Sequence, residues 1–432
     1  MNRMKMSEDF QETFPLKEPS LSINLLLLLL RDNLDVSETA FICKSTSSNE
    51  LEEVVTFAFN QGVPTLFYSI LKEKGLLGFF PACSISELQA RYINYTILYT
   101  RLYYDFGRVV RILQEDGIDV LVLKGLHLVP VLFKNPARRE IGDIDLLIRR
   151  KDIVRACSLL IKEGFGSPDY YPSDETCDWV HQLKPLVNSR GSVVELHWTL
   201  SMYGPGKPMS IDLDELWNRS EKFQFNNFTA RVLSPEDLLL HLVVHVTIVH
   251  HFDVRIKGLY DIHAVVVHYS SKINWSELLV RAEEWNVQKC IILTLGLANK
   301  LFKTPVPESI LLRTEKPEFS EMMKLAFKII DSECYGDNLK SMPLMQILKT
   351  KSIISALSLI SKKLFYPTAF IASMYDLSPN TPILKLYAFR AKNMISIFIN
   401  NIRQMAVAKK SGKKEVFEYE RQVDHIMDFL KK

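Results

Sequence analysis

Cysteine is scarce in this chain and follows no metal-binding or redox spacing. Six cysteines occur among 432 residues, and no two of them form a Cys-x-x-Cys pair. A disulfide framework and a cysteine-built zinc site are therefore not expected, and the pattern is typical of reduced thiols in a cytoplasmic protein. The scattered positions are Cys43, Cys83, Cys157, Cys177, Cys290 and Cys334.

A strong charge of one sign is also missing. The 53 lysines and arginines nearly balance the 50 acidic residues, which gives a formal net charge of +3. This excess is too small to predict a nucleic-acid-binding surface, so nucleic acid is not an expected partner. The hydrophobic fraction of 47% and the length are ordinary for a globular protein with two or three domains.

The N-terminal apolar run, residues 22–30, is too short to span a membrane. A spanning helix takes about 20 apolar residues. Acidic residues precede the run and no small-residue cleavage site accompanies it, so a signal peptide is not expected either. The run therefore predicts a buried helix.

The most informative feature is the segment 142–148, Gly-Asp-Ile-Asp-Leu-Leu-Ile. On a β-strand, residues i and i+2 point to the same face, so Asp143 and Asp145 are predicted to lie side by side. Adjacent carboxylates repel each other unless positive charge lies between them, and a pair of divalent cations can supply it. An isolated Asp-x-Asp is also common in turns. The neighbouring sequence therefore has to show whether this pair binds metal.

Upstream, a phosphate-binding turn is predicted. Residues 118–124 have the apolar character of a buried strand that ends at Lys124-Gly125, and a helix is expected over residues 126–134. A strand that opens into a helix directs backbone N–H groups toward an anion. Lys124 adds a cation suited to phosphate.

Downstream, a third carboxylate is predicted on another strand, within residues 193–200. Glu195 and His197 alternate onto one face of this strand, while the apolar residues between them face the other way. Three acidic side chains on neighbouring strands, beside a Lys-Gly turn, form the arrangement that two-metal nucleotidyl transfer requires.

Roles for the carboxylates follow from this chemistry. Asp143, Asp145 and Glu195 are the predicted metal ligands and catalytic residues, and the expected cofactor is a pair of Mg²⁺ ions, with Mn²⁺ as an alternative. Glu195 is expected to complete the ion beside the acceptor hydroxyl and to help deprotonate it. Lys124 and Gly125 are expected to hold the triphosphate in line.

Two more residues are grouped with nucleotide binding. Arg139 lies four residues before Asp143, so we expect it to help hold phosphate, with Arg138 as the alternative. His197 shares a face with Glu195 and is expected to hydrogen-bond that carboxylate or the acceptor. A packing role for His197 remains open.

These motifs resemble the bacterial "uncharacterised nucleotidyltransferase" family of the polymerase-beta-like nucleotidyltransferase superfamily. The resemblance rests on three segments: Leu123-Lys124-Gly125, Arg139 with Gly142-Asp143-Ile144-Asp145-Leu146-Leu147, and Glu195-Leu196-His197-Trp198. It implies transfer of a nucleoside monophosphate from an NTP, with ATP expected, to an acceptor hydroxyl and release of pyrophosphate. The acceptor would be a small molecule, a glycan or a peptide.

One departure from the wider superfamily affects the phosphate turn. The superfamily usually has Gly-Ser or Gly-Gly there, whereas this chain has Lys124-Gly125 followed by Leu126. Because the phosphate-contacting serine is absent, a catalytically weak or inactive nucleotide-binding scaffold in a biosynthetic pathway is the alternative function.

The expected fold is mixed α/β, with a small mixed β-sheet that has helices on one face, flanked by N-terminal helices and a larger C-terminal helical region. Strands are predicted near 118–124, 142–148, 179–187 and 193–200, and helix N-caps at Asn49, Ser234 and Asn274. The expected regions are a poorly ordered N-terminus (1–20), N-terminal helices (21–116), the catalytic core (117–232), a helical domain closing the cleft (233–335) and a basic helical region (336–432).

Several other patterns leave alternatives open. Tyr92, Tyr95, Tyr99 and Tyr103 mark one helical face, which is a core stripe or an aromatic wall for a base or sugar. His241 and His245, at i and i+4, line the cleft or share a zinc ion.

The positions Arg255, Lys257 and Asp261 form either a phosphate contact, with Asp261 orienting one cation, or a surface ion pair. The basic C-terminal stretch forms either an amphipathic helix with a solvated face or a contact with an anionic membrane carrying lipid-linked substrates.

Overall fold

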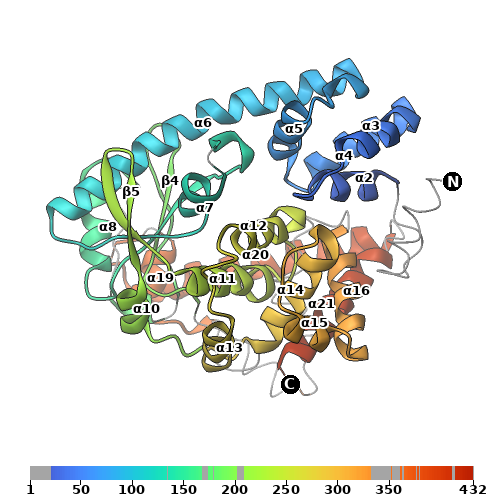
Figure 1. Cartoon of the computed structure of the whole chain (residues 1–432). Helices are drawn as coiled ribbons and strands as arrows, with labels where there is room; N and C mark the ends of the chain where they lie inside the picture. Colours follow the sequence, from blue (N-terminus) through green and yellow to red (C-terminus); the bar gives the residue numbers. More distant parts are fainter. Residues whose placement is uncertain are drawn as a thin grey trace.

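A computed structural model of the whole chain shows a mixed β-sheet surrounded by helices (Figure 1). It describes residues 21–133, 135–167, 174–178, 180–201, 209–331, 352, 361, 364–375, 377–378, 380–410 and 414–431. The predicted loosely ordered segment 1–20 and Cys334 lie outside these residues.

The described sheet has six strands in the order β3-β4-β2-β1-β6-β5. Neighbours β2 and β4 are parallel, as are β1 and β6, and the other pairs are antiparallel. The predicted mixed α/β fold with a small mixed sheet is therefore confirmed. The strands are β1 (Leu121–Val122), β2 (Asp143–Leu147), β3 (Leu186–Val187), β4 (Val193–His197), β5 (Glu221–Phe225) and β6 (Phe228–Val232).

Two predicted strands are much shorter than expected, the strand expected at 193–200 ends at His197, and one hairpin was not predicted. The strand expected at 118–124 pairs regularly only over β1, because the backbone turns into the left-handed region at Lys124 (φ 43°). The strand expected at 179–187 is reduced to β3 and an isolated bridge between Gln182 and His197. Strands β5 and β6 form the unpredicted hairpin at the sheet edge.

One face of the sheet packs against helices α6 (Ala82–Glu115) and α8 (Ile153–Lys162) (Figure 1). Ile144 and Leu146 of β2 and Val194 and Leu196 of β4 are buried in this core. Strand alternation therefore directs the acidic side chains of β2 and β4 to the opposite face.

The tyrosine stripe of α6 belongs mainly to this core. Tyr95 and Tyr99 are buried in it, whereas Tyr104, next in sequence to Tyr103, is exposed. The core-stripe alternative is thus supported over an aromatic wall for a ligand. Tyr95 also makes polar contacts, since its hydroxyl donates to the Arg139 carbonyl at 2.9 Å and accepts from the Ile141 N–H at 2.6 Å.

A second, larger core joins the N-terminal helices to those that follow the sheet. The predicted buried helix is α2, whose Leu25, Leu26 and Leu27 are fully buried. This core contains or adjoins α2 (Leu21–Leu29), α3 (Val36–Ser45), α4 (Ser48–Asn60), α5 (Pro64–Glu73), η1 (Leu77–Phe79), α11 (Pro235–Val244), α12 (Arg255–His268), α13 (Trp275–Glu284), α14 (Gln288–Phe302), α15 (Glu308–Thr314), α16 (Pro317–Asp331) and α21 (Lys414–Lys431).

The remaining described helices are short connections or lie in the C-terminal part. A π-helical turn, η4, continues α11 directly. The bounds are α7 (Lys124–Leu128), η2 (Val129–Phe133), η3 (Pro136–Arg138), α9 (Asp174–Cys177), α10 (Leu213–Arg219), η4 (His245–Val249), α19 (Thr368–Met374) and α20 (Ile383–Lys410).

Two of the three predicted helix caps are confirmed. Ser234 accepts from the Asp237 N–H, and Asn274 accepts from the Glu277 N–H. The prediction at Asn49 is wrong: Ser47 caps α4 in a reciprocal capping box with Glu50. The box satisfies the N–H groups of Ser47 and Glu50, so α4 begins at Ser48, two residues before the start that an Asn49 cap would give.

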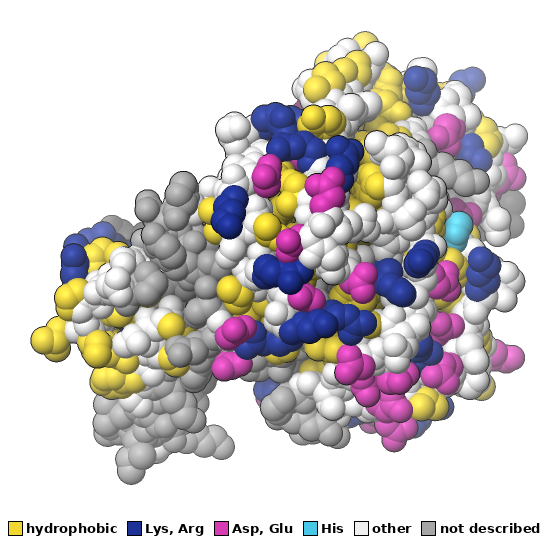
Figure 2. Space-filling model, turned by 90° about the vertical axis from the view of Figure 1, so that its left-hand side faces the viewer, with side chains coloured by type: hydrophobic (Ala, Val, Ile, Leu, Met, Phe, Trp, Pro, Cys, Tyr) yellow, Lys and Arg dark blue, Asp and Glu magenta, His cyan; other side chains and the backbone are white. Residues whose placement is uncertain are grey.

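The surface has no broad field of one sign on the face that Figure 2 presents. Lys and Arg side chains are interspersed there with Asp and Glu side chains, as the near balance of charges in the chain leads one to expect (Figure 2). Among the described residues, no helix is both long enough and apolar enough to cross a membrane. Cys43, Cys83, Cys157, Cys177 and Cys290 carry free thiols.

Candidate active site

The three predicted carboxylates meet on one face of the sheet. Asp143 and Asp145 alternate on β2, and the parallel register pairs Asp145 directly with Glu195 of β4. Asp145, Glu195 and His197 each offer a ligand atom within 4.8 Å of the other two. Carboxylate oxygens suit Mg²⁺ and Mn²⁺, and an imidazole suits the transition metals, so this donor set fits a divalent cation.

Asp145 is the electrostatic centre of the group. Its Oδ1 atom lies 2.8 Å from Lys124 Nζ and 3.0 Å from His197 Nε2, and its side chain is buried. Burial alone would raise the pKa of Asp145, but the charges of Lys124 and His197 hold it well below its usual range. Burial and the charge of Lys124 would lower the pKa of His197, but its contacts with Asp145 and Glu195 raise it.

Asp143 has the opposite electrostatic situation. Burial and the neighbouring charge of Asp145 raise the pKa of Asp143 to about 6. One carboxylate of the pair is thus held ionised while the other is destabilised as an anion. This is the local charge imbalance that a bound cation would relieve.

The Lys-Gly turn is more sharply bent than predicted. Helix α7 begins at Lys124 itself, two residues before the predicted start, and its regular α-helical part ends at Leu128. Gly125 is required by close packing, because a Cβ atom there would overlap Ile141 Cγ2 and lie 2.6 Å from Arg139 Nη1. The turn and the segment before β2 therefore touch directly.

Arg139 lies beside this turn. Its side chain is held by Asp261, which was predicted to orient Arg255 or Lys257. The Nε and Nη2 atoms of Arg139 donate to the two carboxylate oxygens of Asp261 at 2.7 and 2.8 Å. The predicted orienting role of Asp261 thus applies to Arg139, not to Arg255 or Lys257. Arg138, the alternative to Arg139, forms an ion pair with Glu73 at 3.2 Å instead.

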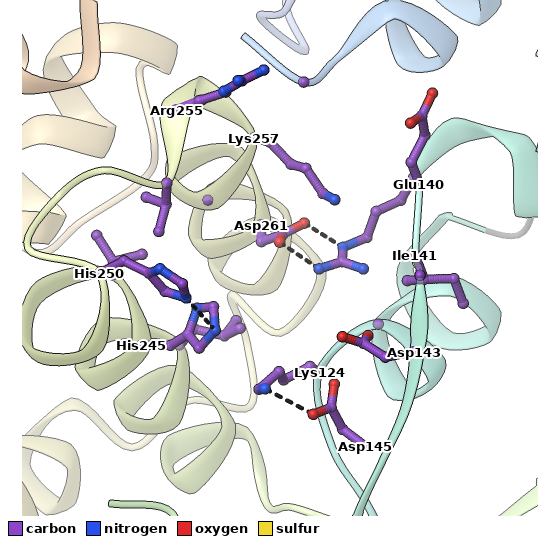
Figure 3. Close-up of a pocket in the computed structure, with 18 of the residues that line it drawn as sticks. Lys124, Glu140, Ile141, Asp143, Asp145, His245, His250, Arg255, Lys257 and Asp261 are labelled. Atoms are coloured by element: carbon purple, nitrogen blue, oxygen red, sulfur yellow. Dashed lines mark hydrogen bonds and ion pairs between the residues drawn. The ribbon is translucent and has the colours of Figure 1, made fainter. Parts of the chain in front are cut away.

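These side chains surround a cavity of about 500 Å³ between the sheet and α12. In Figure 3, Lys124, Asp143 and Asp145 lie on one side of it, and Lys257 and Asp261 on the other. We call it the cationic cavity, because four basic residues line it: Lys124, Arg139, Arg255 and Lys257.

Lys257 is a basic residue of this cavity whose pKa is lowered. Burial, together with the charge of Arg139, lowers the pKa of Lys257 to about 8. Its amine has no hydrogen bond or ion pair within the described part of the chain. It is therefore a cation in need of an anionic partner.

A second cavity, of about 470 Å³, adjoins the first and is lined by Glu195. Lys124, Asp143, His245 and His250 line both cavities, whereas Glu195 lines only the second. We call it the histidine cavity, after His181, His197, His241, His245 and His250. His181 and Gln182 were not among the predicted site residues. They fall within the strand expected at 179–187, where the structure has only an isolated bridge, so strand alternation gave no guide to their side chains.

The two histidines considered for zinc both line the second cavity. The Nε2 atom of His245 lies 3.1 Å from that of His250. The three-ligand group found among the described residues contains neither His241 nor His245. The alternative that they form a polar face of the cleft is therefore the one supported.

Comparison with known proteins agrees with the motifs. A family model described as "Uncharacterised nucleotidyltransferase" matches residues 47–303, more than half of the chain, including all six strands. No curated protein and no solved structure gives a significant match.

Proposed function

The chain belongs to the uncharacterised nucleotidyltransferase family and is an enzyme of that class, and we propose that it moves a nucleoside monophosphate from an NTP to an acceptor hydroxyl. The observation that carries the proposal is the register of β2 and β4, which pairs Asp145 with Glu195 beside a cation-lined cavity. The proposed cofactor is Mg²⁺, with Mn²⁺ as an alternative. The motif resemblance supports a place in the polymerase-beta-like superfamily and a bacterial origin.

Asp143, Asp145 and Glu195 are the proposed metal ligands, and His197 lies beside them within hydrogen-bond distance of Asp145. Two divalent ions held there would neutralise phosphate charge and lower the pKa of the attacking hydroxyl. His197 also holds the orientation of Asp145, the kind of second contact that fixes a metal ligand in place.

The triphosphate is proposed to occupy the cationic cavity. Lys124 and Lys257 supply charge, and Gly125 lines the cavity at the turn. Arg139 contributes a fixed guanidinium, but its pairing with Asp261 offsets much of its charge. ATP is the expected nucleotide.

The proposed reaction is a single in-line displacement. The acceptor oxygen attacks the α-phosphorus, the bond between that phosphorus and the bridging oxygen to the β-phosphate breaks, and pyrophosphate leaves. The hydroxyl proton passes to the Glu195 carboxylate, which faces the acceptor side of the group. Positioning and electrostatics account for most of such catalysis.

The direct test is pyrophosphate release from each of the four NTPs with Mg²⁺ or Mn²⁺. Asp143→Asn and Asp145→Asn should each abolish it, as should EDTA. Asp119→Asn is the matched control, because this exposed carboxylate lies just before β1. Full activity in both active-site variants would contradict the proposal.

The scaffold alternative also has an observation in its favour. Lys124 donates to Asp145 at 2.8 Å, so its ammonium is engaged by a carboxylate, and the phosphate turn lacks serine. A scaffold would bind triphosphate tightly and give no product with any acceptor. Measured transfer would exclude it.

Contact with an anionic lipid surface is the remaining proposal about partners. Helix α20 contains no Asp or Glu, and it exposes Ile395, Phe398 and Ile399 beside Lys392 and Arg403. Apolar side chains among cations are typical of helices that bind membrane surfaces. A cytoplasmic setting stays a prediction from the cysteine pattern.

A further inference from the structure

The candidate metal group lies where two cavities of different chemistry meet. Asp145 lines the cationic cavity, whereas Glu195 and His197 line the histidine cavity. If the triphosphate takes the cationic side, the second substrate must reach the same centre from the histidine side. The residues that line the histidine cavity then indicate which chemical groups the acceptor carries.

Three imidazoles of this cavity, those of His181, His241 and His245, are uncharged at neutral pH. Burial lowers the pKa of His181 to about 4 and of His241 to about 3, and that of His245 lies well below its ordinary value. Each neutral imidazole offers one N–H donor and one nitrogen acceptor. His197 differs, because its bonds to carboxylates raise its pKa.

His241 is the side chain that most clearly points to a ligand. It is 3% exposed and lines the cavity. Neither of its ring nitrogens has a hydrogen-bond partner within the described chain. A buried polar group left unpaired is destabilising, so a ligand that both donates and accepts a hydrogen bond would relieve this cost.

The charges of the cavity disfavour an anionic acceptor. Among the described residues lining it, Lys124 is the sole lysine or arginine, and it is already engaged by Asp145. Asp143 and Glu195 place two carboxylates on the same wall. A phosphate or carboxylate on the acceptor, lying away from the metal group, would therefore find no unengaged lysine or arginine to pair with among these residues.

The rest of the wall suits a ring with apolar faces. Val180, Leu200 and Val249 line the cavity, and Gln182 donates to Glu195 at 3.2 Å. Sugars and cyclic polyols combine hydroxyl groups, which donate and accept, with C–H faces that pack on aliphatic side chains. The cavity of about 470 Å³ has room for one or two such rings.

We propose that the histidine cavity binds the acceptor, and that the acceptor is an uncharged polyhydroxyl compound, a sugar or a polyol, recognised by His241. This inference rests on the proposed nucleotidyl transfer and narrows its acceptor class. A hydroxyl oxygen of the acceptor would form the new bond to the α-phosphorus as pyrophosphate leaves. The proton of that hydroxyl would pass to Glu195.

The first experiment compares acceptors with the full-length protein, Mg²⁺ and α-³²P-labelled ATP. The uncharged set is D-glucose, N-acetylglucosamine, myo-inositol and a disaccharide, and the charged set is glucose 6-phosphate, glucuronate and glucosamine. We expect labelled product from the uncharged set, with at least a tenfold lower kcat/KM for the phosphorylated counterpart. Preferred labelling of an anionic acceptor, or of none, would overturn the inference.

The second experiment varies His241. His241→Leu removes both hydrogen-bonding atoms, whereas His241→Gln keeps a donor and an acceptor. We expect His241→Leu to raise the acceptor KM at least tenfold with less than a twofold change in the KM for ATP. His241→Gln should recover most of the loss. Lys257→Gln should do the opposite: it should raise the KM for ATP and leave the KM for the acceptor nearly unchanged.

A binding measurement separates this inference from the proposed function. Saturation-transfer NMR with the best uncharged sugar should show binding to the wild-type protein and at least tenfold weaker binding to His241→Leu. Unchanged sugar binding in His241→Leu, or no sugar binding at all, would contradict the inference even where ATP binds. Failure of a non-hydrolysable ATP analogue to bind would contradict the proposed function instead. Circular dichroism checks folding, and His181→Gln is the second variant if His241→Leu does not fold.

Discussion

At the scale of single residues, the charge balance around Asp145 separates two neighbouring acids. Asp145→Asn would leave Lys124 buried without its carboxylate partner, so we expect the metal-free protein to lose about 3–5 kcal/mol of unfolding free energy. Asp143→Asn removes a carboxylate whose ionisation is already disfavoured, so little or no loss is expected. Urea unfolding in EDTA measures both. Equal losses would refute this division of roles.

Lys257 predicts how triphosphate binding depends on pH. Burial and the charge of Arg139 lower its pKa to about 8, although the nearby acids raise it in part. These acids are Asp261, Glu140 and Asp143. The amine is cationic below that pKa, so affinity should fall, about tenfold, as the pH rises from 7 to 9.5. Bound triphosphate favours the cation and moves the midpoint upward. Calorimetric titration with a non-hydrolysable ATP analogue and Mg²⁺ measures this.

The control for the pH prediction is Lys257→Arg, which stays cationic throughout this range. Its affinity should change little with pH. Lys257→Gln should bind weakly at every pH. An unaltered pH profile in Lys257→Gln would assign the dependence to another group.

Gly125 predicts a steric effect on the phosphate turn. An alanine Cβ there would overlap Ile141 Cγ2 and crowd Arg139, so Gly125→Ala should cost about 1–3 kcal/mol of unfolding free energy and raise the KM for NTP. Gly142→Ala is the matched control, because nothing lies within 4 Å of its added Cβ. The control should change stability by less than about 0.5 kcal/mol. Equal effects at the two positions would contradict the packing argument.

Alternation along single strands made the acidic residues predictable. Asp143, Asp145 and Glu195 were placed on one face because the period of a strand is two, and the structure has them there. The partner of Arg139 could not be predicted in this way. Asp261 lies 122 residues later in the chain, and no local pattern brings an arginine before β2 to a helix after the sheet.

At the scale of elements, the pair of Arg139 and Asp261 ties the segment before β2 to α12 across the cationic cavity. Asp261→Asn should cost about 3 kcal/mol of unfolding free energy, because the buried guanidinium loses its partner. It should also raise the KM for NTP, because Arg139 loses the two hydrogen bonds that orient it. The neighbouring pair of Arg91 and Glu140 has similar geometry, but the Arg91 side chain is 51% exposed. Arg91→Gln should cost less than about 1 kcal/mol. A KM unchanged in Asp261→Asn would show that the pair is merely structural.

Element boundaries were less predictable than element types. The apolar residues at 118–123 indicated a strand, but β1 pairs for two residues because the Lys124 backbone turns away. The hairpin of β5 and β6 was missed, although Asn226 at its turn has a positive φ of 34°. Asparagine tolerates that conformation. An asparagine turn between segments with alternating phenylalanines was therefore the pattern that could have predicted this hairpin.

Helix α20 predicts binding to anionic vesicles. Apolar residues Ile395 and Ile399 lie one turn apart and are exposed, and the helix has basic but no acidic residues. Vesicles with phosphatidylglycerol should retain the protein at low salt, and pure phosphatidylcholine should not. The double variant Ile395→Asp and Ile399→Asp should lose at least tenfold in retention. Leu312→Asp, at an exposed apolar residue of α15, is the control. An equal loss of retention in this control would show that α20 is not the membrane-binding element.

At the scale of the whole molecule, the active-site helices share one core with the C-terminal helix. The family match ends at residue 303, yet α21 packs beyond it against α16, where the rings of Phe319 and Phe429 meet at 5.1 Å. Ile426 of α21 and Leu242 of α11 belong to the same buried cluster. Stability of the catalytic part should therefore depend on α21.

Ile426→Ala tests that dependence, because Ile426 is 1% exposed and its truncation leaves a cavity. We expect a loss of about 2–4 kcal/mol of unfolding free energy, in one transition seen alike by tryptophan fluorescence and far-ultraviolet circular dichroism. His425→Ala, at the exposed neighbouring position, should change it by less than about 0.5 kcal/mol. Because α11 and α12 line the cationic cavity and share the core with α21, triphosphate binding should be lost at the same urea concentration as the fold. Binding that outlasts the unfolding of α21 would show instead that the matched region 47–303 is stable without it.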